Sequence, residues 1–495
     1  MSFQPPVKDL LPSINLVQDL ISTRNYTVKL PGHYLNDQHF EVKKEGKQYI
    51  FSGSSKIQKG LQTHKEIQFL REDLITLKDD SHILYVEGKH ILLNNIGYDA
   101  DHELKLFSGS INSFSSSADH ADLNNRCLRM IIPDTDKSDF SLHGFKHLYF
   151  TTPKKGMVDY LPVIFQDNEY HLYKCSVSKK KYLVIDCVSE ETLVNFQKKC
   201  FNILLTYGFI TGNLIHDECF ILSFADDKMT VPIGFLFHSM RSSVITHQAT
   251  FTSNPYSVNS DIDFEREEDG RIKDTVSKKL YEGMEDFPRD VFSKLSQLFF
   301  LEEKLQRAAL LFIQSHITSL EMRIPNYYVA IEAITGYISS SVATGSKSLA
   351  PIKDPHLAAD LIAIILHKVT ELKKEKGLDD TEFNLDILKK NINKLNAPPN
   401  ADKLAESFTL LRYNLSPEEK KILKDRNTFL HGSFLKTIDD DLAFREALHV
   451  GLRVHFLIAV AILKLGGFSG KIINYAELWS HITEKQLNEE RLVKI

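Results

Sequence analysis

The spacing of apolar residues changes once along the chain, and this change constrains the fold more than any other feature. Up to residue 251, apolar and polar residues alternate around short turns, for example in HFEVKKEGKQYIFSG (39–53). After residue 292, apolar residues recur every three or four positions. Strands require the first pattern and helices require the second. The sequence therefore predicts an α+β protein, with a β-rich antiparallel half followed by an all-α half.

Antiparallel hairpins are predicted in the first half, where pairs of runs rich in Val, Ile, Tyr and Phe flank a short turn. One helix is expected among them, over residues 189–208, with Gly208 as its end. The predicted hairpins span residues 39–53, 82–95, 170–189 and 219–237.

A polar and acidic segment, TSNPYSVNSDIDFEREEDGRIKD (252–274), separates the two halves. Such a composition is typical of a connection between domains. The chain of 495 residues is also too long for a single core. We therefore expect a β-rich domain over residues 1–251, a linker with a connecting helix over 252–292, and an all-α domain over 293–495.

Helices with short connections are predicted throughout the second half, as in a helical bundle. Pro325 is expected to open the second of them. The most apolar stretch, VHFLIAVAILKLGGF (454–468), contains His455 and Lys464 and is too short to span a membrane, so it is expected to be a buried core helix. The other predicted helical segments are 293–322, 354–377, 381–396, 401–415, 416–431 and 438–467.

Several functional classes find no support in the sequence. The five cysteines form no C-x-x-C pair, which indicates free thiols in a reducing compartment. No H-E-x-x-H, Cys/His cluster or phosphate-binding glycine loop is present, so neither a metal nor a cofactor is expected. The beginning, MSFQPPVKDLLPSINLV, has no signal-peptide pattern. We expect a cytoplasmic protein without a membrane segment.

The segment KDRNTFLHGSF (424–434) carries the strongest chemical signal. Upstream, Ser416, Pro417 and Glu419 have the pattern of a helix start with a capping box, and Gly432 is a natural helix end. This predicts one helix of about three and a half turns.

Arg426, Asn427 and His431 would lie in the last turns of that helix. Asn427 and His431 are four residues apart and share a face, and Arg426 is adjacent. These three side chains could converge on one phosphate group. A histidine can hold or release a proton near neutral pH, as phosphodiester cleavage requires.

The spacing of an arginine and a histidine is not specific by itself. Arg241 and His247 match it as well, without a following Asn or a capped helix, and we interpret them as a coincidence. For Arg426 and His431 an alternative also stands: both side chains could simply satisfy free carbonyl groups at a helix end.

Together with the surrounding helices, RNTFLHG (426–432) resembles the HEPN family, an all-helical family with the signature R-x(4–6)-H. The stretch YYVAIEAITGY (327–337) resembles the Apea-like branch of that family, with Glu332 in the acidic position. Members of this branch are often joined to a large β-rich N-terminal domain in antiphage defence proteins. The resemblance covers residues 293–490, and over 1–251 it concerns the architecture alone.

The resemblance implies a metal-independent endoribonuclease. The ribose 2′-hydroxyl would attack the neighbouring phosphorus and leave a 2′,3′-cyclic phosphate. Arg426 would hold the phosphate, His431 would act as general acid or base, and Asn427 would orient either group. Because one histidine cannot readily serve both sides of the phosphorus, the resemblance also implies a homodimer with two motifs in one cleft.

Other residues around the motif have two interpretations each. Glu332 either pairs with Arg426 or is an ordinary solvated side chain. Lys420, Lys421 and Lys424 either line a path for RNA or form a solvated helix face. The net charge of −5 means that RNA binding would need such a local patch.

Regulation is expected to come from the N-terminal domain, with a phage-derived trigger as its candidate partner. One alternative function is a non-catalytic HEPN module for dimerisation or for nucleotide or RNA binding. A carbohydrate- or ligand-binding protein led by the β-rich half is a further alternative that no motif supports.

Overall fold

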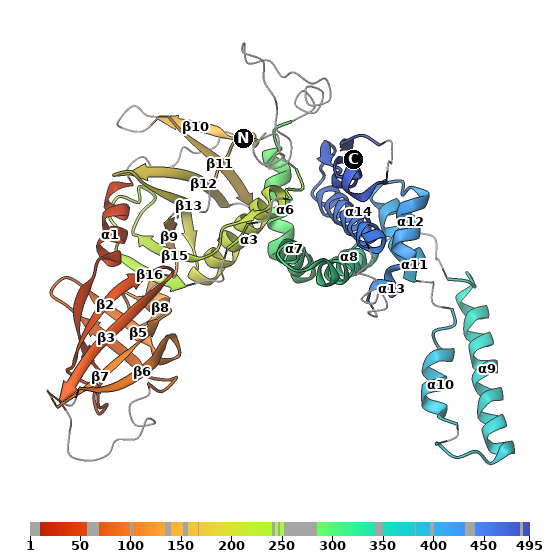
Figure 1. The fold of residues 1–495 in the computed structure, drawn as a ribbon, viewed down its shortest axis with the longest axis horizontal. Coiled ribbons are helices and arrows are strands. Elements are labelled where there is room, and N and C mark those ends of the chain that lie inside the picture. Colours follow the sequence, from red (N-terminus) through yellow and green to blue (C-terminus); the bar gives the residue numbers. More distant parts are fainter. Residues whose placement is uncertain are drawn as a thin grey trace, which may run out of the picture. The chain divides into compact units, whose positions relative to one another are not determined.

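The chain forms two compact units in the computed structural model (Figure 1). Unit 1 comprises Met1–Ile317, Gly466–Ile473 and Arg491–Lys494, and unit 2 comprises Thr318–Leu465, Asn474–Glu490 and Ile495. The structure describes residues 10–56, 69–99, 101, 103–133, 140–151, 157–166, 168–239, 243–245, 248–251, 285–341, 350–381, 383–396, 400–430, 441–485 and 489–495.

The units divide between Ile317 and Thr318, and not within the linker predicted at 252–292. Residues 252–284 lie outside the described part of the chain. The fold class is the expected one, because unit 1 contains a large antiparallel sheet and unit 2 is helical in its described residues.

Unit 1 is organised around one antiparallel sheet of 15 strands in the order β10-β11-β12-β13-β9-β15-β16-β8-β5-β4-β1-β2-β3-β7-β6. Two further pairs, β14 with β17 and β18 with β19, stand apart from it. The strands are β1 (Arg24–Lys29), β2 (His39–Glu45), β3 (Gln48–Lys56), β4 (Leu74–Lys78), β5 (Ile83–Glu87), β6 (Ile91–Asp99), β7 (Leu104–Ile111), β8 (Ser113–Ser115), β9 (Arg126–Pro133), β10 (Leu148–Thr151), β11 (Met157–Phe165), β12 (Asn168–Val177), β13 (Lys180–Glu191), β14 (Asn213–Leu214), β15 (Glu218–Phe224), β16 (Gly234–Ser239), β17 (Val244–Ile245), β18 (Lys471–Ile473) and β19 (Leu492–Lys494).

Three of the four predicted hairpins are confirmed: β2 with β3, β12 with β13, and β15 with β16. The fourth, over 82–95, is wrong, because β5 pairs with β4 and β8 whereas β6 pairs with β7. The glycine between β5 and β6, Gly88, does not form a hairpin turn but allows a close backbone contact. Gly88 lies so close to the backbone of Leu70 that an added Cβ would fall 1.7 Å from the Leu70 carbonyl oxygen.

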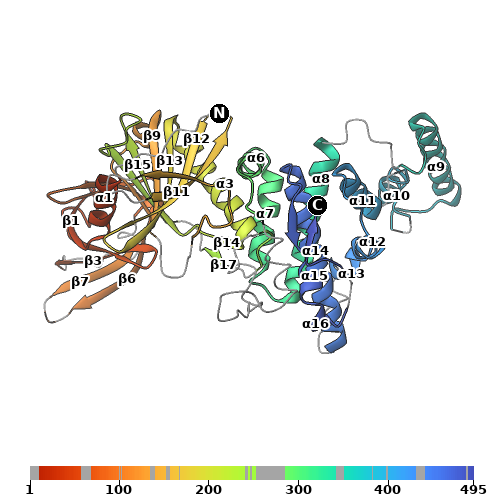
Figure 2. The ribbon, with the colours of Figure 1, turned by 90° about the horizontal axis from the view of Figure 1, so that it is seen from above.

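Alternate residues of the central strands face two different layers, as the pleat of a strand requires. On β15, Phe220 and Leu222 belong to the main apolar core, together with Ile14 and Val17 of helix α1 (Leu11–Ile21). The opposite face of the sheet is covered in part by helix α3 (Leu193–Thr211), which contacts β13 and β9 (Figure 2).

Helix α3 continues past its predicted end at Gly208. Gly208 packs against Leu214, where an added Cβ would lie 2.8 Å from the Leu214 Cα atom. Gly212, with a φ angle of 73°, is the residue that ends the helix. Gly208 therefore permits a close approach and does not stop the helix.

Two further helices of unit 1, α6 (Arg289–Leu301) and α7 (Glu303–Ser315), follow at the end of its first segment. A single helix over 293–322 was the prediction, and it is wrong because the backbone leaves the helical conformation at Glu302. Both helices are hydrogen-bonded to α3, from Ser296 to Thr206 and from Gln306 to Asn202. These contacts explain why they belong to unit 1.

Unit 2 surrounds a long apolar helix, α14, whose residues Leu452–Leu463 are all buried. By length and composition α14 could cross a membrane, but 78% of its most apolar window is buried inside the protein. It is the core helix that the sequence predicted. The described helices of unit 2 are α8 (Leu320–Ser341), α9 (Pro355–Lys376), α10 (Leu385–Ile392), α11 (Asn400–Leu410), α12 (Pro417–Lys424), α13 (Arg426–Leu430), α14 (Asp441–Leu465), α15 (Tyr475–Leu478) and α16 (Ser480–Thr483).

Pro325 does not open α8, as was predicted, but lies inside it. The helix begins at Leu320, and both Leu320 and Ile324 pack against Gly451 of α14. Packing against the core helix thus extends α8 upstream of the proline, at the cost of one backbone hydrogen bond.

Candidate functional site

The helix that leads to the motif begins as predicted. The Ser416 hydroxyl accepts a hydrogen bond from the Glu419 amide at 3.2 Å, and the Glu419 carboxylate accepts one from the Ser416 amide at 2.8 Å. Pro417 occupies the first turn, so the capping box is complete. These contacts set the start of α12.

The predicted continuous helix over 416–431 is wrong, because the helix is interrupted at Asp425. Asp425 has φ and ψ angles of −81° and 3°, and a separate short helix, α13, begins at Arg426. Arg426 is therefore the first residue of a helix and not part of a last turn. His431, Gly432, Arg241 and His247 lie outside the described residues.

Arg426 forms an ion pair with Glu332 of α8. The Arg426 Nη1 and Glu332 Oε1 atoms are 2.6 Å apart, although the angles are not those of a good hydrogen bond. Glu332 therefore pairs with Arg426, which is the first of its two interpretations, and is not an ordinary solvated side chain. The Arg426 side chain is 15% exposed and that of Glu332 is 37% exposed, so the pair lies at the surface of unit 2 without being freely solvated.

Asn427 contacts the same guanidinium. Its Oδ1 atom accepts a hydrogen bond from Arg426 Nε at 3.3 Å. Arg426 is thus held through Nη1 by a carboxylate and through Nε by an amide. A planar guanidinium oriented in this way can present its remaining N–H groups to a phosphate oxygen.

Tyr328, which the sequence reasoning did not single out, joins the two short helices to α8. It lies four residues before Glu332 and hence on the same face of the helix. Its hydroxyl donates to the Ile422 carbonyl of α12 at 2.8 Å, and its ring stacks on Phe429 of α13 at 5.8 Å. Burial raises the pKa of Tyr328, so the hydroxyl keeps its proton and remains a donor.

The predicted RNA-binding lysines are exposed. Lys420, Lys421 and Lys424 lie on α12, whose opposite face buries Ile422 and Leu423. Their exposure is compatible with both interpretations, so contact with RNA stays a prediction.

A buried charged cluster behind α12 was also not predicted. Glu419 is 2% exposed, accepts a hydrogen bond from the Tyr413 hydroxyl at 3.0 Å, and lies 3.6 Å from Arg453 of α14. Arg453 in turn holds Glu489 through both of its terminal nitrogens, at 2.6 and 2.9 Å. Asn474 donates a further hydrogen bond to Glu489. The carboxylate that caps α12 is thereby connected to the core helix.

His449, one turn before Arg453 on α14, makes a second contact with α12. Its Nε2 atom lies 2.8 Å from the Glu418 carboxylate. Burial lowers the pKa of His449 more than the neighbouring Glu418 raises it, and Lys485 and Arg453 lower it further. The neutral imidazole therefore donates its N–H group to Glu418 near neutral pH.

Taken together, Tyr328 and Glu332 of α8 contact both α12 and α13, and Arg453 of α14 contacts the first turn of α12. The arrangement places one oriented guanidinium and one amide at the surface, next to a lysine-rich helix face. Within the described residues, no group of three or more His, Cys, Asp or Glu side chains could hold a metal ion.

Comparison of the chain with models of protein families, with curated proteins and with solved structures found no match in any of the three.

Proposed function

We propose that the protein is a metal-independent endoribonuclease of the HEPN kind, of the Apea-like branch. The observation that carries the proposal is the ion pair between Arg426 and Glu332, beside Asn427. It orients the arginine of an R-x(4–6)-H signature as a phosphate-binding group requires. The pairing partner is the acidic residue that the family resemblance singles out.

In the proposed reaction the ribose 2′-hydroxyl attacks the adjacent phosphorus and the 5′-oxygen leaves. Arg426 binds the phosphate and stabilises the negative charge that develops in the transition state. His431 transfers a proton, either from the 2′-hydroxyl or to the leaving oxygen. The products carry a 2′,3′-cyclic phosphate and a 5′-hydroxyl, which only RNA can give because DNA lacks the nucleophile.

The proposal includes a homodimer, since two proton transfers on opposite sides of one phosphorus need two histidines. The three exposed lysines of α12 would guide the RNA backbone toward Arg426. We further propose that unit 1 regulates the activity in an antiphage role, with a phage-derived trigger, and that the protein acts in the cytoplasm.

The test is cleavage of total cellular RNA by the purified full-length protein in the presence of EDTA. Arg426→Ala and His431→Ala should each lower the cleavage rate by about 10²-fold or more. The cleaved ends should resist 3′-end ligation until the cyclic phosphate is opened and the resulting monophosphate is removed to give a 3′-hydroxyl.

Matched controls distinguish chemistry from damage to the fold. Arg445→Ala removes a part-exposed arginine of α14 that pairs with two carboxylates, and His367→Ala removes an exposed histidine of α9. Both should retain full activity. Cleavage that EDTA abolishes, or that survives in Arg426→Ala and His431→Ala, would contradict the proposal.

A further inference from the structure

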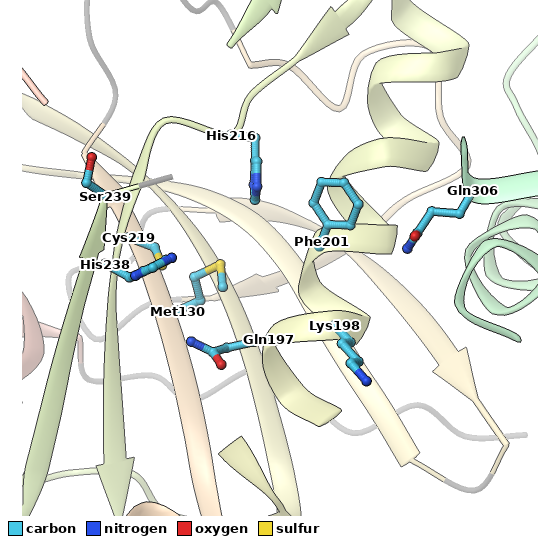
Figure 3. A pocket seen from close by; sticks show the side chains of 9 residues that line it. All are labelled: Met130, Gln197, Lys198, Phe201, His216, Cys219, His238, Ser239 and Gln306. Atoms are coloured by element: carbon cyan, nitrogen blue, oxygen red, sulfur yellow. The ribbon is translucent and has the colours of Figure 1, made fainter. Parts of the chain in front are cut away.

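A cavity of about 670 Å³ lies in unit 1 between helix α3 and the sheet. Met130 and Cys219 from the sheet and Phe201 from α3 form its apolar wall, and His216 and His238 add imidazole rings. Figure 3 shows these side chains directed into one space, with Gln197 of α3 at its lower edge. The ribonuclease proposal does not use this cavity.

A second cavity of about 290 Å³ adjoins the first, because both are lined by Gln197 and His238. The strand register explains the shared wall. His238 of β16 lies opposite Cys219 of β15 on one side and Ser113 of β8 on the other. Cys219 lines the larger cavity and Ser113 lines the smaller one. His238, on the strand between them, therefore lines both cavities.

The lining of the two cavities is rich in groups that can carry positive charge. Besides His216 and His238 it includes the residues Lys89, His90, His120 and Lys198. Among the described residues that line either cavity, the one carboxylate is Glu87, and it is ion-paired with Lys89. Such a lining offers several N–H donors to an anion and gains positive charge when its histidines are protonated.

The histidines of the smaller cavity oppose each other's protonation. The rings of His90 and His238 are 6.1 Å apart between centroids. The pKa of each is lowered, first by burial, and then by neighbouring positive groups, Lys89 for His90 and His120 for both. A bound anion would relieve this repulsion and would be stabilised in return.

The larger cavity has the character of a site for a planar heterocycle. The rings of Phe201 and His216 are in contact, with 4.6 Å between their centroids, and form an aromatic corner. Met130 supplies a polarisable apolar surface, and the amide of Gln197 can both donate and accept hydrogen bonds. Nucleobases are recognised by this combination of stacking and amide contacts.

We propose that the two cavities bind a nucleoside phosphate, with the phosphate among His90, His120 and His238 and the base against Phe201 and His216. The cavity volumes suit a ligand of this size, since small-molecule sites in proteins span about 300–1,000 Å³. The binding site does not depend on the ribonuclease assignment, and binding can be measured whether or not RNA is cleaved.

The experiment is isothermal titration calorimetry of the full-length protein with AMP, GMP, CMP and UMP, beside the corresponding nucleosides and inorganic phosphate. At least one monophosphate should bind with a Kd below about 1 mM. Its nucleoside and inorganic phosphate should each bind about tenfold more weakly or worse, because each lacks half of the contacts.

Variants locate the site. His238→Gln, Phe201→Leu and Lys89→Gln should each weaken nucleotide binding about tenfold, since hydrogen bonds to charged groups and base stacking contribute on this scale. Lys43→Gln is the matched control, because Lys43 forms the same exposed ion pair with a glutamate two residues away, Glu45, outside both cavities. Lys89 and Lys43 are both part-exposed, so neither substitution disturbs the core.

Three outcomes would overturn the proposal. The first is that none of the four monophosphates binds with a Kd of about 1 mM or lower, which corresponds to a binding free energy of about −4 kcal/mol. The second is that inorganic phosphate binds as tightly as the nucleotide. The third is that His238→Gln, Phe201→Leu and Lys89→Gln all bind the nucleotide as the unchanged protein does.

Discussion

Arg426 on α13 and Glu332 on α8 lie 2.6 Å apart between Nη1 and Oε1, and this ion pair joins a very short helix to a long one. Helix α13 has five residues, too few to be stable in isolation. Helix α8 has 22 residues and buries one whole face in unit 2. The orientation of the arginine is therefore set by α8 more than by its own helix.

The first prediction concerns this pair. Glu332→Gln should lower the rate of RNA cleavage by about tenfold to a hundredfold, because a small misplacement of a phosphate-binding group is costly. Glu332→Asp, which restores the charge, should recover part of the loss. The readout is the initial rate of RNA cleavage.

Its control is Glu303→Gln on α7, which breaks an exposed ion pair with Arg307. This variant should cleave RNA at the normal rate. If Glu332→Gln also cleaves normally, Glu332 does not position Arg426.

Unit 2 carries a built-in probe for stability measurements. The chain has one tryptophan, Trp479, and it lies in unit 2 with its ring 5.6 Å from that of Tyr475. Its fluorescence reports the unfolding of unit 2 even in the full-length chain.

The second prediction concerns Tyr328. Tyr328→Phe leaves the buried Ile422 carbonyl without its donor and should lower the free energy of unfolding by about 1–3 kcal/mol. Tyr328→Ala also removes the ring beneath Phe429 and should cost about 3–5 kcal/mol. Urea titration followed by Trp479 fluorescence measures both. Tyr149→Phe, at an exposed site in unit 1, should leave the Trp479 transition in place.

The third prediction concerns the buried cluster behind α12. Arg453→Met leaves the carboxylates of Glu419 and Glu489 without their cationic partner and should destabilise unit 2 by about 3–5 kcal/mol. The measurement is again urea titration with Trp479. Arg445→Met on the same helix, where the ion pairs are at the surface, should have a far smaller effect. Equal losses of stability in the two variants would show that the effect of Arg453→Met does not come from the burial of its ion pairs with Glu419 and Glu489.

The fourth prediction is a dependence on pH. Because burial lowers the pKa of His449, the unfolded chain binds a proton there first as the pH falls. The stability due to neutral His449 is thus complete above about pH 6.5, the ordinary pKa of histidine, and is lost on acidification through the lower pKa of the folded state. His449→Gln keeps a donor for Glu418 but cannot titrate.

Unit 2 of this variant should therefore lose less stability between pH 7.5 and pH 5.5 than the unchanged protein, when each is unfolded by urea. His367→Gln, on the exposed part of α9, should show the unchanged dependence on pH. A greater acid sensitivity in His449→Gln than in the unchanged protein would reverse the expected sign.

Local signals in the sequence were sufficient for many elements. Asp354 and Gly377 bound α9 as a cap and a left-handed stop, and Ser416 with Glu419 starts α12. The errors arose where a residue serves a distant contact. Gly88 accommodates Leu70 and Gly208 accommodates Leu214, yet both read locally as turn or stop signals.

The candidate site shows the same division. Glu332 and Arg426 were identified through a family resemblance, and their pairing needed the structure because α8 and α13 are far apart in sequence. In the sequence, Tyr328 has the pattern of an ordinary apolar position of a helix. Its hydrogen bond to Ile422 could not be predicted, because the two residues are 94 positions apart. The break at Asp425 was missed because its immediate neighbours, Lys424 and Arg426, favour helix, although aspartate is itself a common N-cap residue.

Unit 2 is an insertion in unit 1, and this has a consequence for how the chain is made. Residues 466–473 and 491–494 complete unit 1, where the Ile473 amide donates to the Thr250 carbonyl and Phe468 stacks on Phe287. A ribosome synthesises the polypeptide from its N-terminus, so helices α8 to α14 of unit 2 are made before those residues. Deletion of residues 1–270 would remove Thr250 and leave the Ile473 amide without this acceptor. Synthesis of unit 1 therefore begins before that of unit 2, but unit 1 can fold completely only after the helices of unit 2 have been made.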